Sequence, residues 1–208
     1  MVASWERLTS VTLSSTDDEI VTPTFTPKKH LRVSYNGVSQ SADSDVWLQF
    51  GTGGTMDTTN GNYQWRNGRN SNSDNTDSND SKINLIGANM NTTNGYTYSD
   101  IYISNESASN KLCIAETLTV TAGAGTAPDN AETVGRYANT SAQINILRVF
   151  LTQNSAVFAV GSTITVWGAD DQVSTPFYPN LPNGVIFEQS DDGKHYMFDG
   201  TSAWNEMT

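Results

Sequence analysis

The sequence predicts an all-β protein, an antiparallel, jelly-roll-like β-sandwich with a C-terminal β-hairpin appendage. Two observations lead to this fold class. No stretch combines a helical composition with apolar residues at i, i+3, i+4 and i+7, which is the pattern of an amphipathic helix. Short runs rich in β-branched and aromatic residues recur instead, separated by turns of Gly, Asn, Asp and Ser. Such spacing is typical of a sandwich or barrel.

The strongest strand patterns lie within residues 1–169. Residues 29–38 alternate, with Leu31 and Val33 on one face, as a half-buried strand does. Residues 143–151 form a nearly continuous apolar run, which predicts a strand buried on both faces. Shorter candidates are residues 11–13, 19–21, 46–50, 101–103, 111–120 and 162–167. We therefore predict a sandwich domain over residues 1–169.

Residues 51–81 interrupt this rhythm of strands. They are rich in Gly, Asn, Ser, Thr and Asp, and Tyr63 and Trp65 are among their few large apolar side chains. A structureless loop of this length is uncommon in a compact domain and is often functional. Two interpretations stay open. The segment is either a long polar surface loop, with at most one strand around Tyr63, or a loop that packs on a neighbouring subunit through its aromatics.

The C-terminal part of the chain predicts a separate appendage. Three prolines make residues 170–183 an extended linker, because proline cannot donate to a sheet ladder. Residues 184–208 hold two strand patterns around Asp192-Gly193, a strong hairpin signal. An isolated hairpin is marginally stable in water. Its apolar side chains must therefore be covered, either by the main domain or by another chain.

Aromatic side chains in the loop, linker and tail are the candidates for contact with a partner. Large aromatic groups with a polar handle are common at interfaces. The candidates are Tyr63, Trp65, Phe177, Tyr178, Phe187, Tyr196, Phe198 and Trp204. Trp47 and Trp167 lie within strong strand patterns, and we expect both in the core.

No catalytic, cofactor-binding or metal-binding residue is predicted. The chain has two histidines, His30 and His195, and one cysteine, Cys113. These are too few and too far apart for a Ser/His/Asp arrangement or a zinc pattern. Cys113 lies in an apolar run, and we expect a buried, inert thiol. The aspartates within residues 74–80 lack the spacing of a calcium-binding loop. We expect a protein that binds rather than catalyses.

The charge of the chain limits its partners. The formal net charge is -11, which opposes binding to nucleic acid and to anionic membrane surfaces. No run approaches the roughly 20 apolar residues of a membrane span, and the opening residues lack the apolar stretch of a secretory signal. We expect no nucleic-acid or membrane partner and synthesis inside a cell.

Several segments together resemble virion proteins of tailed bacteriophages, especially those of cyanobacterial and other marine hosts. They are Trp5-Glu6-Arg7-Leu8, Asp18-Glu19-Ile20 and Lys28-Lys29-His30-Leu31 near the start, then 134–144, 161–168 and the tail from 186 to 206. Each motif is short and none is catalytic.

This resemblance implies a capsid decoration or cement protein on the outer surface of the virion. Such a protein binds the major capsid protein or other virion proteins and stabilises the lattice, often as a homotrimer. The alternative is a head-fibre or tail component. Its sandwich would bind host glycans through exposed aromatics, for which Trp65 and Trp204 are the candidates.

Overall fold

The protein is all-β, and its strands belong to two separate units. The computed structural model describes residues 4–38, 44–70, 73–85, 95–120, 127–152, 156–171, 182–189, 193–200 and 203–207. The units divide after Asp171. All regular structure in the described residues consists of strands paired antiparallel. The prediction of an all-β antiparallel sandwich with a C-terminal hairpin is confirmed, and the hairpin belongs to a small sheet.

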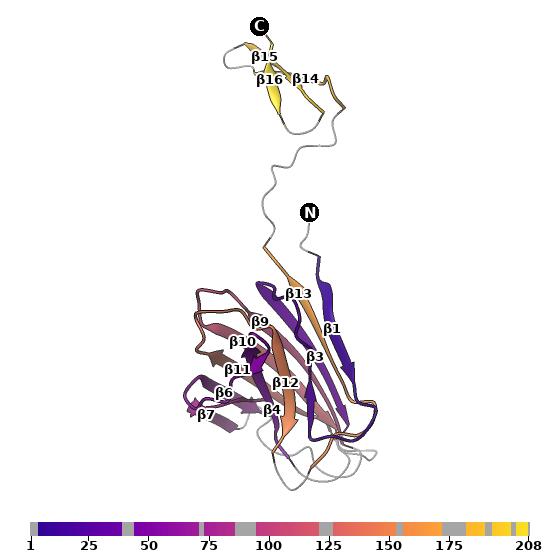
Figure 1. Ribbon diagram of the computed structural model, residues 1–208, viewed down its shortest axis with the longest axis vertical. Coiled ribbons are helices and arrows are strands. Elements are labelled where there is room, and N and C mark those ends of the chain that lie inside the picture. The colour runs from indigo at the N-terminus through magenta and orange to yellow at the C-terminus, as the bar shows by residue number, and fades with distance from the viewer. Residues whose placement is uncertain are drawn as a thin grey trace. The chain divides into compact units, whose positions relative to one another are not determined.

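The first unit contains two sheets, which Figure 1 shows as separate layers. The larger sheet has eight strands, in the order β1 (Glu6–Thr12), β13 (Thr163–Ala169), β3 (His30–Val38), β9 (Tyr96–Ser104), β10 (Lys111–Val120), β11 (Asp129–Tyr137), β6 (Tyr63–Arg69) and β7 (Ser73–Asp80). The smaller sheet has the order β2 (Glu19–Val21), β12 (Ile146–Leu151), β4 (Val46–Thr52) and β5 (Thr55–Met56), with β8 (Ile83–Asn84) also paired to β4.

The strand order is that of a jelly roll with two insertions. In chain order, β1, β2, β3, β4, β8, β9, β12 and β13 divide between the two sheets. The larger sheet contains β1, β13, β3 and β9 as successive neighbours, which are the first, eighth, third and sixth of these strands. The smaller sheet contains β2, β12, β4 and β8, which are the second, seventh, fourth and fifth. This is the double Greek key of a jelly roll. Strands β10, β11, β6 and β7 widen the first sheet beyond β9.

The prediction of a long polar loop at 51–81 is wrong. Strands β5, β6 and β7 occupy much of it, with β6 paired to β11 and β7 paired to β6. Strand β7 is the edge of the sheet, and its side chains from Asp74 to Asn79 are exposed. A strand exposed on both faces needs no apolar alternation, and charged side chains protect an edge from further pairing. The polar composition of β7 is therefore why the sequence pattern did not indicate a strand there.

Strand β12 is buried on one face rather than two. Leu147 and Val149 are buried, whereas Arg148 and Phe150 are half-buried on the opposite face. The Arg148 guanidinium carbon lies 4.4 Å from the centroid of the Phe150 ring. The guanidinium therefore covers the ring, which is how an apolar run is accommodated on an outer face.

An aromatic group in the core ties the inserted strands to the smaller sheet. The ring centroids of Tyr63 and Tyr137 are 4.8 Å apart, and Phe50 lies 6.2 Å from Tyr63. The Phe50 amide donates to the Tyr63 hydroxyl at 3.0 Å, and that hydroxyl lies 2.9 Å from the Phe50 carbonyl and 3.0 Å from the Asp57 carbonyl. A buried hydroxyl needs such partners. Tyr63 on β6 therefore connects the widened sheet to β4.

The C-terminal unit is a three-stranded sheet. Strands β14 (Ile186–Gln189) and β15 (Lys194–Phe198) form the predicted hairpin, and β16 (Trp204–Glu206) adds a third strand that the sequence did not reveal. The Trp204 ring lies 5.2 Å from Phe198 and 5.9 Å from Phe187, centroid to centroid. A third strand with an aromatic cluster stabilises what would otherwise be a lone hairpin.

Replacing Tyr63 with Phe tests the tie between the two sheets. The change leaves the Phe50 amide without this acceptor, and we expect the free energy of unfolding to fall by about 1–3 kcal/mol. Urea denaturation measures the loss. Tyr96→Phe on the exposed side of β9 is the matched control and should change stability by less than about 0.5 kcal/mol. Equal stability of the two variants would contradict the role assigned to Tyr63.

Candidate functional site

The residues predicted for partner contact in the first unit are already packed. Tyr63 is fully buried, so it presents no ring to a partner while the sandwich is folded. Trp65 is half-buried against the core, and its ring centroid lies 6.2 Å from that of Trp47. Its indole N–H donates to Asp80 Oδ2 at 3.2 Å. The segment 51–81 thus uses its aromatics inside its own sandwich.

The other predicted contact residues belong to the linker and tail. Phe177 and Tyr178 lie outside the described residues. Within the tail sheet, Phe198 is buried, Tyr196 and Trp204 are half-buried, and Phe187 is exposed. Phe187 is therefore the predicted tail aromatic that remains most available for contact.

A larger exposed surface lies on the outside of the eight-stranded sheet. We call the outward side chains of β13, β3, β9, β10 and β11 the outer face. Side chains along β10 alternate strictly between buried and exposed. Ile114 is 60% exposed, and Leu112, Leu118 and Val134 are also exposed. Sequence reasoning missed this surface because β10 carries apolar residues at both alternating sets of positions.

Cross-strand pairing arranges the outer face in rows. Across β3, β9, β10 and β11, the first row is Arg32, Tyr102, Ile114 and Val134; the second is Ser34, Asp100, Glu116 and Glu132; the third is Asn36, Tyr98, Leu118 and Asn130. The second row, which we call the acidic row, thus separates two rows that carry aromatic and aliphatic side chains.

The acidic row is only partly neutralised. Arg32 donates to both oxygens of Asp100, from Nε at 2.9 Å and from Nη2 at 2.7 Å. This hydrogen-bonded pair raises the pKa of Arg32 further above its ordinary value. Glu116 stands directly opposite Glu132, an arrangement of like charges that destabilises a sheet. Within the described part of the chain, no ion pair joins a cation to either glutamate.

A hollow of about 390 Å³ lies on the outer face beside these rows. It is lined by Trp5, Arg32, Ser34, Tyr98 and Trp167. We call it the aromatic hollow. Trp167 is half-buried there rather than in the core as expected, because it points to the side opposite its buried neighbour Val166.

A second hollow of about 320 Å³ shares Trp5 with the first. Tyr102, Ser104, Leu112 and Ile114 are among its lining residues. Trp5 lies just before β1. One exposed indole thus borders both hollows and connects the aromatic half of the outer face with its aliphatic half.

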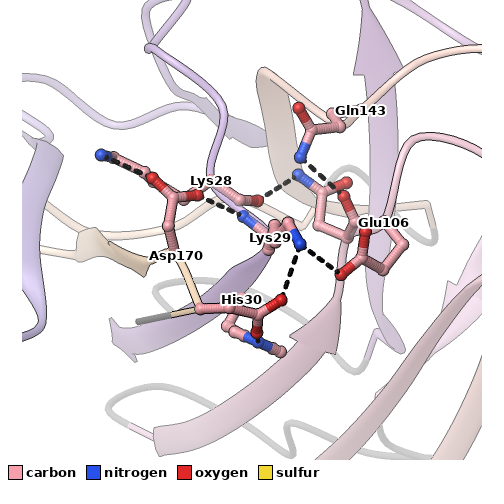
Figure 2. A network of polar contacts seen from close by, with 8 residues as sticks. Lys28, Lys29, His30, Glu106, Gln143 and Asp170 are labelled. Carbon is pink, nitrogen blue, oxygen red and sulfur yellow. Dashed lines mark hydrogen bonds and ion pairs between the residues drawn. The ribbon is translucent and has the colours of Figure 1, made fainter. Parts of the chain in front are cut away.

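A polar network holds the end of β13 against the start of β3. Figure 2 shows Lys28 and Lys29 among carboxylates. Lys28 Nζ lies 2.7 Å from Glu6 and 3.0 Å from Asp170. Lys29 Nζ lies 2.6 Å from Asp171 and 3.5 Å from Glu106. Its contacts join segments far apart in the sequence.

The same network includes His30, and through Asn105 it also contacts the backbone at Ile144. His30 Nε2 lies 2.9 Å from Asp171 Oδ1, so its partner is a carboxylate at the end of the sandwich. The Asn105 side chain donates to the Lys28 carbonyl at 2.9 Å and accepts from the Ile144 amide at 2.7 Å. These contacts give the network a positioning role for the backbone.

The remaining reactive groups are tied into the fold. Burial raises the pKa of the Cys113 thiol to about 12, as expected for an inert cysteine. Burial lowers the pKa of Lys111, whose ammonium donates to the carbonyls of Ser109 and Asn139, each at 2.7 Å. No group of three or more His, Cys, Asp or Glu side chains among the described residues is placed to hold a metal ion.

Comparison with known proteins adds no relative. No family model, no curated protein and no solved structure matches this chain. In the ranges that the structure describes, no helix could cross a lipid bilayer. The site must therefore be interpreted from its own geometry.

The network around Asp170 predicts a loss of stability in acid. The hydrogen bond from Lys28 and the backbone N–H of Lys29 lower the pKa of Asp170, and Lys29 lowers that of Asp171. A carboxylate with a depressed folded-state pKa stabilises the fold above its unfolded pKa of about 3.9, and this stabilisation is lost as pH falls through the folded pKa. We expect the free energy of unfolding to decrease below about pH 4.

Asp170→Asn removes one of these carboxylates. Denaturation measured from about pH 6 to about pH 2 should show a shallower decline for the variant than for the parent. A decline of equal steepness in both proteins would mean that Asp170 does not contribute.

Proposed function

We propose that this chain is a structural protein of a tailed-phage virion, and specifically a capsid decoration protein that binds the major capsid lattice. The observation that carries the proposal is the band of exposed aliphatic side chains on β10 and β11. The resemblance of segments between residues 5 and 168 to phage virion proteins supports it. The jelly-roll topology agrees with it, since capsid proteins use this fold.

The aliphatic band has the character of a protein-binding surface. Ile114 and Val134 are paired across β10 and β11, and both are more than half exposed. Leu112 extends the band along β10, and Leu118 lies on the same face beyond Glu116. Contiguous apolar side chains on paired strands are costly to leave in water and mark interaction sites. One face of the sheet can bury them together against a lattice.

The acidic row adds a requirement on the partner. Glu116 and Glu132 repel each other in the free chain, and a Lys or Arg of the partner would relieve this repulsion and fix the register of docking. A second copy docked face to face would bring its own acidic row onto this one. The predicted homo-oligomer, a trimer, would therefore form through another surface.

Decoration by this mechanism needs no chemistry. A specific contact of standard size buries about 1,600 Å², and repeated contacts on a lattice add through avidity. The added buried area across joints between capsid subunits would oppose outward pressure. The net charge of -11 suits the outer surface, away from packaged DNA.

Copy number in the particle tests the location. We expect quantitative mass spectrometry of purified virions to find this chain in amounts comparable to the major capsid protein. A few copies per particle would place it in the tail or fibres instead. Its absence from virions would overturn the proposal.

The aliphatic band is tested by Ile114→Ser. We expect the full chain with this change to remain folded and to bind purified capsids at least about tenfold more weakly, because a central apolar contact is lost. Val160→Ser is the matched control, since Val160 is 59% exposed, as Ile114 is 60% exposed, but lies at a turn before β13. Val134→Ser provides a second test of the band. Unchanged capsid binding by both Ile114→Ser and Val134→Ser would exclude this face.

A further inference from the structure

The aromatic hollow differs from the aliphatic band in its chemistry. Trp5, Tyr98 and Trp167 line it together with Arg32, which is hydrogen-bonded to Asp100. Flat aromatic rings and polar groups with defined directions converge on one concave site. Such a combination of apolar walls with a few placed polar groups is typical of a pocket for a small ligand.

We propose that the aromatic hollow binds a neutral saccharide. The C–H groups on one face of a pyranose ring carry a small positive charge and pack on the negative face of an aromatic ring. The hydroxyl groups at the edge of the sugar need donors and acceptors. The hollow supplies the rings through Trp5, Tyr98 and Trp167, and the polar partners through Arg32 and Ser34.

Arg32 is held in position before any ligand arrives. Its Nε and Nη2 are bonded to Asp100, and its guanidinium carbon lies 5.3 Å from the centroid of the Tyr102 ring. A guanidinium has five N–H donors, so the two bonds to Asp100 leave others that can point into the hollow. A fixed donor loses little conformational entropy when a ligand binds.

The Arg32–Asp100 pair also decides the charge of the ligand. Asp100 neutralises Arg32, so the hollow has no excess positive charge for a carboxylated or sulfated sugar. The neighbouring Glu116 and the net charge of -11 further oppose an anionic ligand. The same argument excludes a nucleic acid, whose binding depends on neutralised phosphates. A neutral ring with many hydroxyls remains.

The size of the hollow and its exposed rings agree with this ligand. At about 390 Å³, it lies near the lower end of the roughly 300–1,000 Å³ of small-molecule sites, which suits roughly one or two sugar rings. Trp5 and Tyr98 are exposed in the free chain, although each would be more stable covered. A saccharide would cover both without entering the core.

This site is independent of the proposed capsid contact. Ile114 and Val134 do not line the aromatic hollow, and the variants that test the two proposals are different. A chain that decorates capsids without binding sugar, or binds sugar without decorating capsids, would separate them.

The test is titration of the full-length chain with free saccharides. Binding is measured by isothermal titration calorimetry and by tryptophan fluorescence. The probes are the neutral trisaccharides maltotriose, cellotriose, mannotriose and chitotriose, with sialyllactose as the charged comparison. We expect at least one neutral trisaccharide to bind at millimolar concentration or below and to change the tryptophan emission, and sialyllactose to bind more weakly. Binding by none of the neutral probes, or tightest binding by sialyllactose, would overturn the proposal.

Substitutions of the lining aromatics locate the site. Tyr98→Ala and Trp5→Ala should each weaken binding roughly five- to tenfold, because each removes one stacking surface. Tyr96→Ala is the matched control: Tyr96 lies two positions before Tyr98 on β9, faces the same side and is similarly exposed, 43% against 38%. Equal losses in Tyr96→Ala and Tyr98→Ala, or no loss in Tyr98→Ala and Trp5→Ala, would place the ligand elsewhere and overturn the assignment.

Discussion

The register of β10 between β9 and β11 is the constraint on which both candidate surfaces depend. Side chains alternate with a period of two, so a slip of one residue would exchange the two faces of the strand. In the observed register, Cys113 and Ala115 point inward, and Leu112 and Ile114 point outward. Among these apolar side chains the small ones are inside and the large ones outside, the reverse of ordinary burial. This inversion creates the aliphatic band.

Close packing beneath the widened sheet explains the inversion. A Cβ atom placed on Gly135 would lie 2.7 Å from Cys113 Sγ and 2.8 Å from Ile83 Cδ1, so this part of the interior has no room for larger groups. Protein interiors are packed to crystal density, and added volume costs stability. Leucine and isoleucine on β10 therefore fit only on the outer face. Strands β10 and β11, which widen the jelly roll, therefore close the core with their inward side chains and present apolar side chains on the outer face.

The two proposed sites divide this outer face between them. The aliphatic band lies on β10 and β11, and the aromatic hollow lies toward β13 and β3, with Tyr98 and Asp100 on β9 at the boundary. The Arg32–Asp100 pair gives the hollow its neutrality, and Glu116 with Glu132 gives the band its negative charge. One sheet therefore presents two chemistries a few strands apart. A flat, lattice-like partner suits one of them, and a small ligand with apolar and polar faces suits the other.

Several features of the fold followed from local sequence alone. The absence of helical periodicity, the alternation in residues 29–38, the two strand patterns of the tail hairpin and the apolar surroundings of Cys113 each report a local preference that the tertiary structure keeps. The outward position of Trp167 also had a signal, since Ile164 and Val166 alternate against the threonines beside them. That signal was outweighed by the size of the indole.

Other features were decided only by tertiary structure, because they depend on neighbours distant in the chain. Strand β7 is polar on both faces, and only its pairing with β6 shows it to be a strand. Strand β10 has apolar residues at both its inward and its outward positions. The space left by Gly135 and Ile83 determines which of these two sets of side chains is buried. The acidic row and the aromatic hollow join residues from several strands. By itself, the sequence determined that this chain forms strands, and the packing between sheets determined which of its side chains face a partner.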